Sequence, residues 1–167
     1  RVVAETRGAV IVFDGVCVLC NGWVGFLLRQ DRAGRYRFAA MQSDTGRALL
    51  AAYGLDPDDP ASFLLVEHDV GASPRISTDT AAIRRVLAGL GGAWRVAHVI
   101  ALIPRPIRDA AYRWLARNRY RWFGRHDACA LPAPEHRQRF LWPRFTLIIR
   151  SHGRNPHHHS RRSFRTA

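Results

Sequence analysis

The sequence predicts an α/β fold in which the elements follow the order β-α-β-α-β-β and additional helices complete the C-terminal part. Two observations predict this class. Short apolar runs rich in β-branched residues alternate with segments whose apolar residues recur every three or four positions. In addition, 47% of the 167 residues are hydrophobic and 23% are charged, which excludes disordered, collagen-like and coiled-coil chains.

The first half of the sheet is expected to be a strand–helix–strand unit. Residues 9–13 form a β-branched apolar run that ends at Asp14-Gly15, as a buried strand before a turn does. From Cys17 onward the apolar spacing is that of a helix. Residues 36–41 then form a second strand, and the crossover between the two strands makes them parallel.

The second half of the sheet is expected to follow one more helix. That helix is capped by Asp44 or Thr45 and ends at Gly54. Residues 62–67 and 75–77 form the third and fourth strands, which a turn joins into an antiparallel hairpin.

Three helices are expected after the hairpin. The first begins at Thr78 or Asp79 and reaches Leu90, and the second covers residues 94–103. The third begins behind two prolines and ends at Gly124, a suitable C-terminal cap. The apolar face of this third helix comprises Ile107, Ala110, Ala111, Trp114, Leu115 and Trp122.

One domain is expected over residues 8–132, made of the α/β core and its C-terminal helical extension. Residues 133–167 are expected to form a basic, disordered tail. No run of about 18 or more apolar residues predicts a membrane-spanning helix, and no secretory signal is expected. We therefore expect a cytoplasmic protein.

The charge is concentrated in the C-terminal part of the chain. All 26 basic residues are arginine, and residues 101–167 carry 15 arginines against 3 acids, which is +12 of the total of +13. Such a field attracts nucleic acid, acidic lipid or an acidic protein. Arginine stems can also simply cover apolar helix faces. The charge therefore predicts where an anionic partner would dock, without identifying it.

Cys17 and Cys20 form a C-x-x-C pair where the first strand passes into the first helix. Their spacing puts both sulfur atoms on one helical face, where they can close a disulfide. The N–H groups at a helix start stabilise a thiolate and lower a thiol pKa from about 8.5 to roughly 3.5–7.5. The pattern predicts that Cys17 attacks a disulfide and that Cys20 resolves the mixed disulfide.

The two cysteines could instead have a purely structural role. Both can be buried core residues, or they can form a permanent disulfide in an oxidising compartment. A zinc site would need a further ligand, which Cys129 with His126 or His136 could provide. We expect neither a metal ion nor a cofactor.

Asp14 also has two possible roles. It can cap the turn by accepting backbone hydrogen bonds. As a partly buried carboxylate near the thiols, it can instead take and return a proton, which makes it a candidate catalytic residue. Its negative charge would oppose ionisation of Cys17.

Asp14, Cys17 and Cys20 match the D-x-x-C-x-x-C signature of the DCC family, which is described as predicted thiol-disulfide oxidoreductases. The run of residues 112–125, followed by Cys129, resembles the C-terminal segment of the same family. The resemblance covers about residues 8–132. It implies a thioredoxin-like fold and exchange with an unknown protein or a low-molecular-weight thiol or disulfide.

Five residues are expected to contact the substrate. The thioredoxin-like fold usually carries a cis-proline before its third strand, and the nearest proline lies slightly early for that position. Two arginines of the last helix are expected to line a charged surface beside the thiols, although at least one could instead hold the helix to the sheet through a carboxylate. The five residues are Val18, Leu19, Pro60, Arg117 and Arg119.

The sequence therefore predicts a thiol-disulfide oxidoreductase. Two alternatives belong to other classes. The arginine-rich half could be a binding module for nucleic acid or a membrane surface, or the chain could be a zinc-stabilised adaptor that uses Cys17, Cys20 and Cys129. Cys129 could also act as a second resolving thiol or be a semi-buried structural residue.

Overall fold

Strands β1 and β3 are the inner strands of a four-stranded mixed sheet with the order β2-β1-β3-β4. The computed structural model describes residues 8–59, 63–68, 73–129 and 132–141. The strands are β1 (Gly8–Phe13), β2 (Tyr36–Ala40), β3 (Leu64–His68) and β4 (Arg75–Thr78).

Pairing within the sheet follows the prediction. Ile11 of β1 lies opposite Phe38 of the parallel strand β2 and opposite Leu65 of the antiparallel strand β3. β3 and β4 form the expected antiparallel hairpin. Since β1 has a neighbour on each side and helices on both faces, its β-branched run is almost completely buried.

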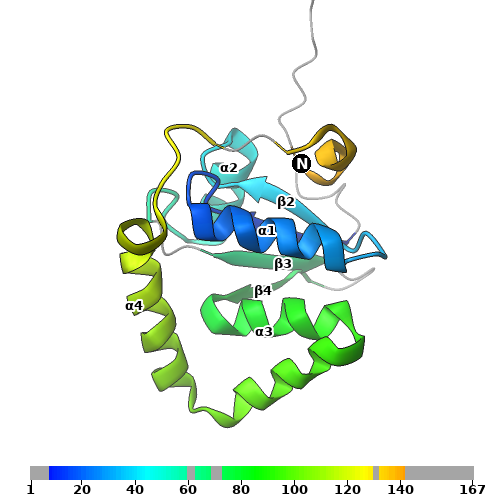
Figure 1. Cartoon of the computed structure of the whole chain (residues 1–167), viewed down its shortest axis with the longest axis vertical. Helices are drawn as coiled ribbons and strands as arrows, with labels where there is room; N and C mark the ends of the chain where they lie inside the picture. Colours follow the sequence, from blue (N-terminus) through cyan, green and yellow to red (C-terminus); the bar gives the residue numbers. More distant parts are fainter. Residues whose placement is uncertain (1–7, 60–62, 69–72, 130–131, 142–167) are drawn as a thin grey trace, which may run out of the picture.

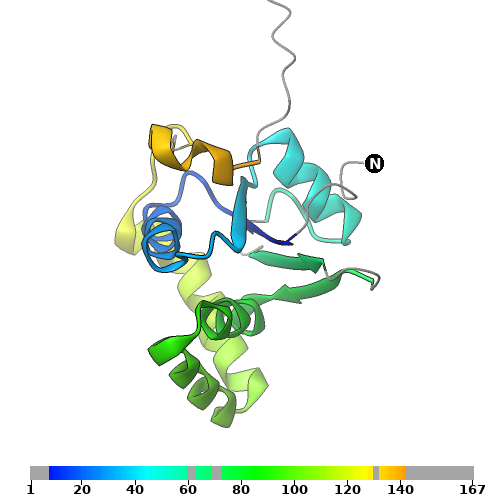
Figure 2. The ribbon, with the colours of Figure 1, turned by 90° about the vertical axis from the view of Figure 1, so that its right-hand side faces the viewer.

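Helices cover both faces of the sheet (Figure 2). α1 (Val18–Gln30) and α3 (Asp79–Leu90) pack on one face, where Phe13 and Phe38 meet Leu27 and Val86. α2 (Asp44–Ala52) packs on the other face, on the cluster that contains Val12. This element order and layering confirm the predicted thioredoxin-like α/β fold.

Two further helices extend the core, η2 (Gly92–Leu102) and α4 (Arg105–Phe123) (Figure 1). η2 corresponds to the helix expected over residues 94–103 and is a 3-10 helix. The apolar face expected for α4 is turned mostly to solvent, and the helix instead buries Ala116 and Arg119. None of the helices in the described ranges combines the length and the hydropathy needed to cross a bilayer.

The folded body continues past the boundary expected at residue 132. η3 (Pro134–Arg139) ends beside β2, where the Leu141 N–H donates to the Phe38 carbonyl over 2.7 Å. Arg139 forms an ion pair with the buried Asp31. These residues are held to the core because Arg139 compensates the buried charge of Asp31 and Phe140 packs on Phe13 and Phe38. Residues 142–167 of the expected tail lie outside the described residues.

α2 begins one or two residues earlier than expected. Ser43 is the N-cap, and its hydroxyl oxygen accepts a hydrogen bond from the Gly46 N–H over 3.1 Å. Gly46 lies so close to the end of β2 that a Cβ atom would fall 2.0 Å from the Ala40 carbonyl oxygen. α2 can therefore approach the sheet only with glycine at this position.

We predict that Gly46→Ala lowers the free energy of unfolding by about 1–3 kcal/mol, since backbone must shift to admit the methyl group. Gly22→Ala in α1 is the matched control, because a Cβ there has no neighbour within 4 Å. It should be neutral or stabilise by up to about 1 kcal/mol through helix propensity. Urea unfolding monitored by circular dichroism measures both, and equal effects would contradict the close approach.

Candidate active site

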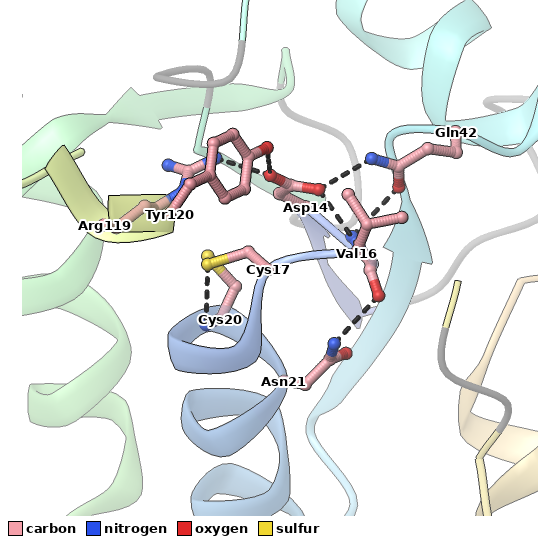
Figure 3. A network of polar contacts seen from close by, with 9 residues as sticks. Asp14, Val16, Cys17, Cys20, Asn21, Gln42, Arg119 and Tyr120 are labelled. Carbon is pink, nitrogen blue, oxygen red and sulfur yellow. Dashed lines mark hydrogen bonds and ion pairs between the residues drawn. The ribbon is translucent and has the colours of Figure 1, made fainter. Parts of the chain in front are cut away.

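The two cysteines lie at the start of α1, directly after the turn that follows β1. Cys17 is the N-cap of the helix, and its Sγ accepts a hydrogen bond from the Cys20 N–H over 3.2 Å. Figure 3 shows the two sulfur atoms side by side. Both residues are thiols in this structure. Cys17 is buried, whereas Cys20 is partly exposed.

The pKa values of the two thiols are shifted in opposite directions. A hydrogen bond from the Cys20 thiol lowers the pKa of Cys17 to about 6, against the opposing effect of burial. The same hydrogen bond, together with burial, raises the pKa of Cys20. Arg119 adds a smaller favourable effect on the Cys17 thiolate, and Asp14 a smaller unfavourable one. At neutral pH the negative charge therefore resides on Cys17.

Asp14 is buried at the end of β1 and accepts four hydrogen bonds (Figure 3). The Val16 N–H and the Gln42 amide donate to Oδ1 over 3.2 and 2.7 Å. Arg119 Nη2 donates to Oδ2 over 2.6 Å, and the Tyr120 hydroxyl donates to the same oxygen. Burial alone would raise the pKa of Asp14, but these side-chain hydrogen bonds outweigh burial and lower it.

The end of α4 is paired with the loop that carries Cys17. Gly124 ends the helix with φ at +90°, a conformation that favours glycine. Arg125 then forms an antiparallel β-bridge with Cys17, and the His126 N–H donates to the Val16 carbonyl over 2.8 Å. Residues 124–126, here called the covering segment, therefore lie along the backbone of Cys17.

Two amide side chains fix the turn between β1 and α1. Gln42 accepts from the Gly15 N–H over 2.9 Å while it donates to Asp14, and Asn21 donates to the Gly15 carbonyl over 2.8 Å. The sequence prediction missed both, as well as Tyr120. Gln42 could have been found, since it follows the parallel neighbour of β1 and so lies at the same edge of the sheet.

The predicted substrate-binding residues occupy different environments. Val18 is 37% exposed beside the thiols, and Leu19 is half-buried. Arg117 is exposed on α4, whereas Arg119 is buried and holds α4 to the sheet through Asp14, which was the alternative expected for one of these arginines. Pro60 lies outside the described residues.

Cys129 lies over the same turn. A Cβ atom at Gly15 would be 2.3 Å from the Cys129 sulfur, so glycine is needed for this contact. Burial, followed by the charge of Asp14, raises the pKa of Cys129. Within the ranges that the structure describes, no three His, Cys, Asp or Glu side chains are grouped so that they could hold a metal ion.

A cavity of about 260 Å³ opens beside the Asp14 network. Gln42 and Tyr120, which both donate to Asp14, form part of its wall. The full lining is Val16, Met41, Gln42, Arg47, Pro57, Asp58, Tyr120 and Arg125.

This chain is similar to known proteins over most of its length. The family model described as DCC1-like thiol-disulfide oxidoreductase matches residues 11–125. "Uncharacterized protein YuxK" of Bacillus subtilis is 40% identical over 132 residues, covering 79% of this chain and 93% of that protein. "DCC family protein At1g52590, chloroplastic" of Arabidopsis thaliana is 38% identical over 128 residues, covering 76% and 72%. No solved structure gives a significant match.

We predict that Cys20→Ala raises the pKa of Cys17 from about 6 toward the ordinary thiol value, because the Cys20 thiol is its principal hydrogen-bond donor. The ultraviolet absorbance of the thiolate, followed during a pH titration, measures this without requiring access to the buried sulfur. Cys129→Ser is the control and should leave the midpoint near 6. A Cys17 midpoint that does not change in Cys20→Ala would show that Cys20 does not set this pKa.

Proposed function

We propose that this chain, which belongs to the DCC1-like thiol-disulfide oxidoreductase family, exchanges disulfides through Cys17 and Cys20. The observation that carries the proposal is the position of the Cys17 sulfur at the N-cap of α1, where it accepts the Cys20 N–H and where the Cys20 thiol lowers its pKa to about 6. The substrate is a disulfide of a protein or a small molecule.

In the first step, the Cys17 thiolate attacks one sulfur of the substrate disulfide. A bond forms between Cys17 and that sulfur, the substrate S–S bond breaks, and the other substrate sulfur leaves as a thiolate. A pKa of about 6 keeps Cys17 mostly ionised at neutral pH, so the nucleophile needs no separate base.

In the second step, Cys20 attacks the sulfur of Cys17. The thiol proton of Cys20 passes to solvent or to the departing sulfur, the mixed disulfide breaks, and the Cys17–Cys20 disulfide forms. The substrate gains two electrons and the pair loses two. The first step prepares the second, because Cys17 loses its charge in the mixed disulfide and no longer holds the Cys20 proton.

Asp14 acts in this proposal as a positioning residue. All four donors to its carboxylate favour the ionised form, which makes it a weak proton acceptor. Its contribution is to hold Arg119 and Tyr120, and hence the end of α4, against the thiol pair.

Access to Cys17 requires the covering segment to separate from the loop, since Cys17 has no exposed surface. The Val18 N–H bond to the Gly124 carbonyl is long, at 3.5 Å, and the His126 bond to Val16 is the shorter of the two. Val18 and Phe123 are both exposed near this junction and offer apolar contact to an incoming substrate.

We predict that Cys20→Ser accumulates a mixed disulfide through Cys17, since the resolving thiol is missing. Incubation with an oxidised model peptide, followed by acid quenching and mass spectrometry, measures the trapped species. The matched control is Cys17→Ser, which should trap far less because the pKa of Cys20 is raised. Trapping by Cys17→Ser but not by Cys20→Ser would identify Cys20 as the attacking residue and contradict the proposal.

We predict that Asp14→Asn lowers the free energy of unfolding by about 3–5 kcal/mol, because the buried Arg119 loses its counter-ion. Single-turnover exchange, normalised to the fraction of Cys17 thiolate, should stay within about tenfold of the unmodified protein. A normalised rate lower by about 10²–10⁴-fold would instead identify Asp14 as a proton carrier. Tyr120→Phe removes one donor to Asp14 but retains the ion pair, so it should lower the free energy of unfolding by less than Asp14→Asn does.

A further inference from the structure

Exposed apolar side chains gather on one part of the molecule. We call residues 92–123, which comprise η2 and α4, the helical arm; Figure 1 shows it reaching away from the sheet. Of the ten large hydrophobic side chains that are exposed in the described residues, eight belong to this arm. They are Val96, Val99, Leu102, Ile103, Ile107, Trp114, Trp122 and Phe123.

The geometry of η2 collects three of them into one row. In a 3-10 helix, side chains three residues apart eclipse one another. Val96, Val99 and Leu102 therefore share one face, and they are 68%, 57% and 82% exposed. The face that contains Trp94 and Ala97 packs inward, with the Trp94 ring 4.9 Å from the ring of Phe26.

α4 continues this apolar surface. Ile107, Trp114 and Trp122 are spaced by seven and eight residues, so they lie on the same side of the helix. They are 62%, 61% and 46% exposed, and the two indole rings are in contact with centroids 4.7 Å apart. The opposite side of α4 carries Ala116 and Arg119, which are buried against the core.

The arm is also strongly basic. It carries seven arginines and one acid, Asp109. Arg105 and Arg113 contact Asp109 and Asp79, whereas no salt bridge within the described residues involves Arg95, Arg117 or Arg121. The last two arginines lie one turn apart on α4, beside the row that contains Trp114.

We propose that the helical arm docks on the surface of an anionic lipid bilayer. Aliphatic side chains enter the acyl boundary, tryptophan indoles lie at the headgroup level, and arginines contact the lipid phosphates. Nucleic acid would be held by the arginines but would leave the row of Val96, Val99 and Leu102 in water, so the apolar row favours lipid. The proposal does not depend on disulfide exchange by the thiol pair.

The orientation of α4 gives this surface a consequence for the thiol site. The same helix supplies Arg119 and Tyr120 to Asp14 through its inner side. A docked arm would therefore hold Cys17 and Cys20 close to the membrane surface without engaging Arg119 or Tyr120.

The test is flotation of the full chain with vesicles of phosphatidylcholine alone or mixed with phosphatidylglycerol. We expect binding to the mixed vesicles, weakening as salt rises. Val99→Ser combined with Leu102→Ser should lower the partition coefficient at least about tenfold. Arg95→Gln and Arg121→Gln should lower it about fivefold each.

Matched controls come from outside the arm. Ile76→Ser removes a 44% exposed aliphatic side chain from β4, and Arg32→Gln removes an exposed arginine after α1. Both should leave binding unchanged. Because the chain has further arginines after residue 141, binding that is equally strong in the arm variants would place the contact elsewhere and overturn the proposal.

Three more results would also overturn it. The first is that the chain does not bind the mixed vesicles. The second is that copies of the chain associate with one another and that the Val99 and Leu102 changes abolish this association. The third is that the chain binds single-stranded RNA and that only the arginine changes weaken this binding. Disulfide exchange measured on the same variants in solution should be unchanged, which separates failure of this inference from failure of the proposed exchange.

Discussion

The ion pair between Asp14 and Arg119 determines the architecture of the thiol site. The two side chains are 5% or less exposed, lie 2.6 Å apart and are separated by 105 residues of sequence. Removing either partner would leave a buried, uncompensated charge, which is strongly destabilising. The signature aspartate and the C-terminal helix α4 are therefore parts of one structure, and the domain cannot keep the thiol pair in this setting without both.

The two charges of this ion pair act on the Cys17 thiol in opposite directions. Arg119 favours the Cys17 thiolate, and Asp14, with the smaller effect, opposes it. The N-cap position and the Cys20 thiol then determine which sulfur is ionised. Asp14 and Arg119 carry opposite charges, so their ion pair can fix α4 beside the thiols. The ionisation of the thiols depends on the local geometry of the C-x-x-C turn.

The sequence predicted the sheet and the thiol pair because both depend on local signals. The apolar, β-branched run at residues 9–13 indicates a buried strand, and β1 is covered on every side. The spacing of apolar residues that begins at Cys17 indicates a helix. The orientation of α4 could not be predicted in this way. Apolar periodicity put Trp114 on the apolar face of this helix, whereas a long-range polar contact through Arg119 turns most of that face to solvent.

The extension to Leu141 was missed for a related reason. Its basic composition is typical of a tail, but Arg139 pairs with Asp31 and Phe140 packs against Phe13 and Phe38. No local pattern indicates these partners. The role of Gln42 could have been predicted from topology, because Phe13 lies opposite Ala40 and the ends of both strands meet at one edge.

The most direct test of the account is a titration of the chain across glutathione redox buffers, with alkylation and mass spectrometry to identify which thiols have paired. We expect one two-electron midpoint at which Cys17 and Cys20 are oxidised together, while Cys129 remains alkylated throughout. Cys17 and Cys20 that never pair with each other, or that pair only with Cys129, would contradict it.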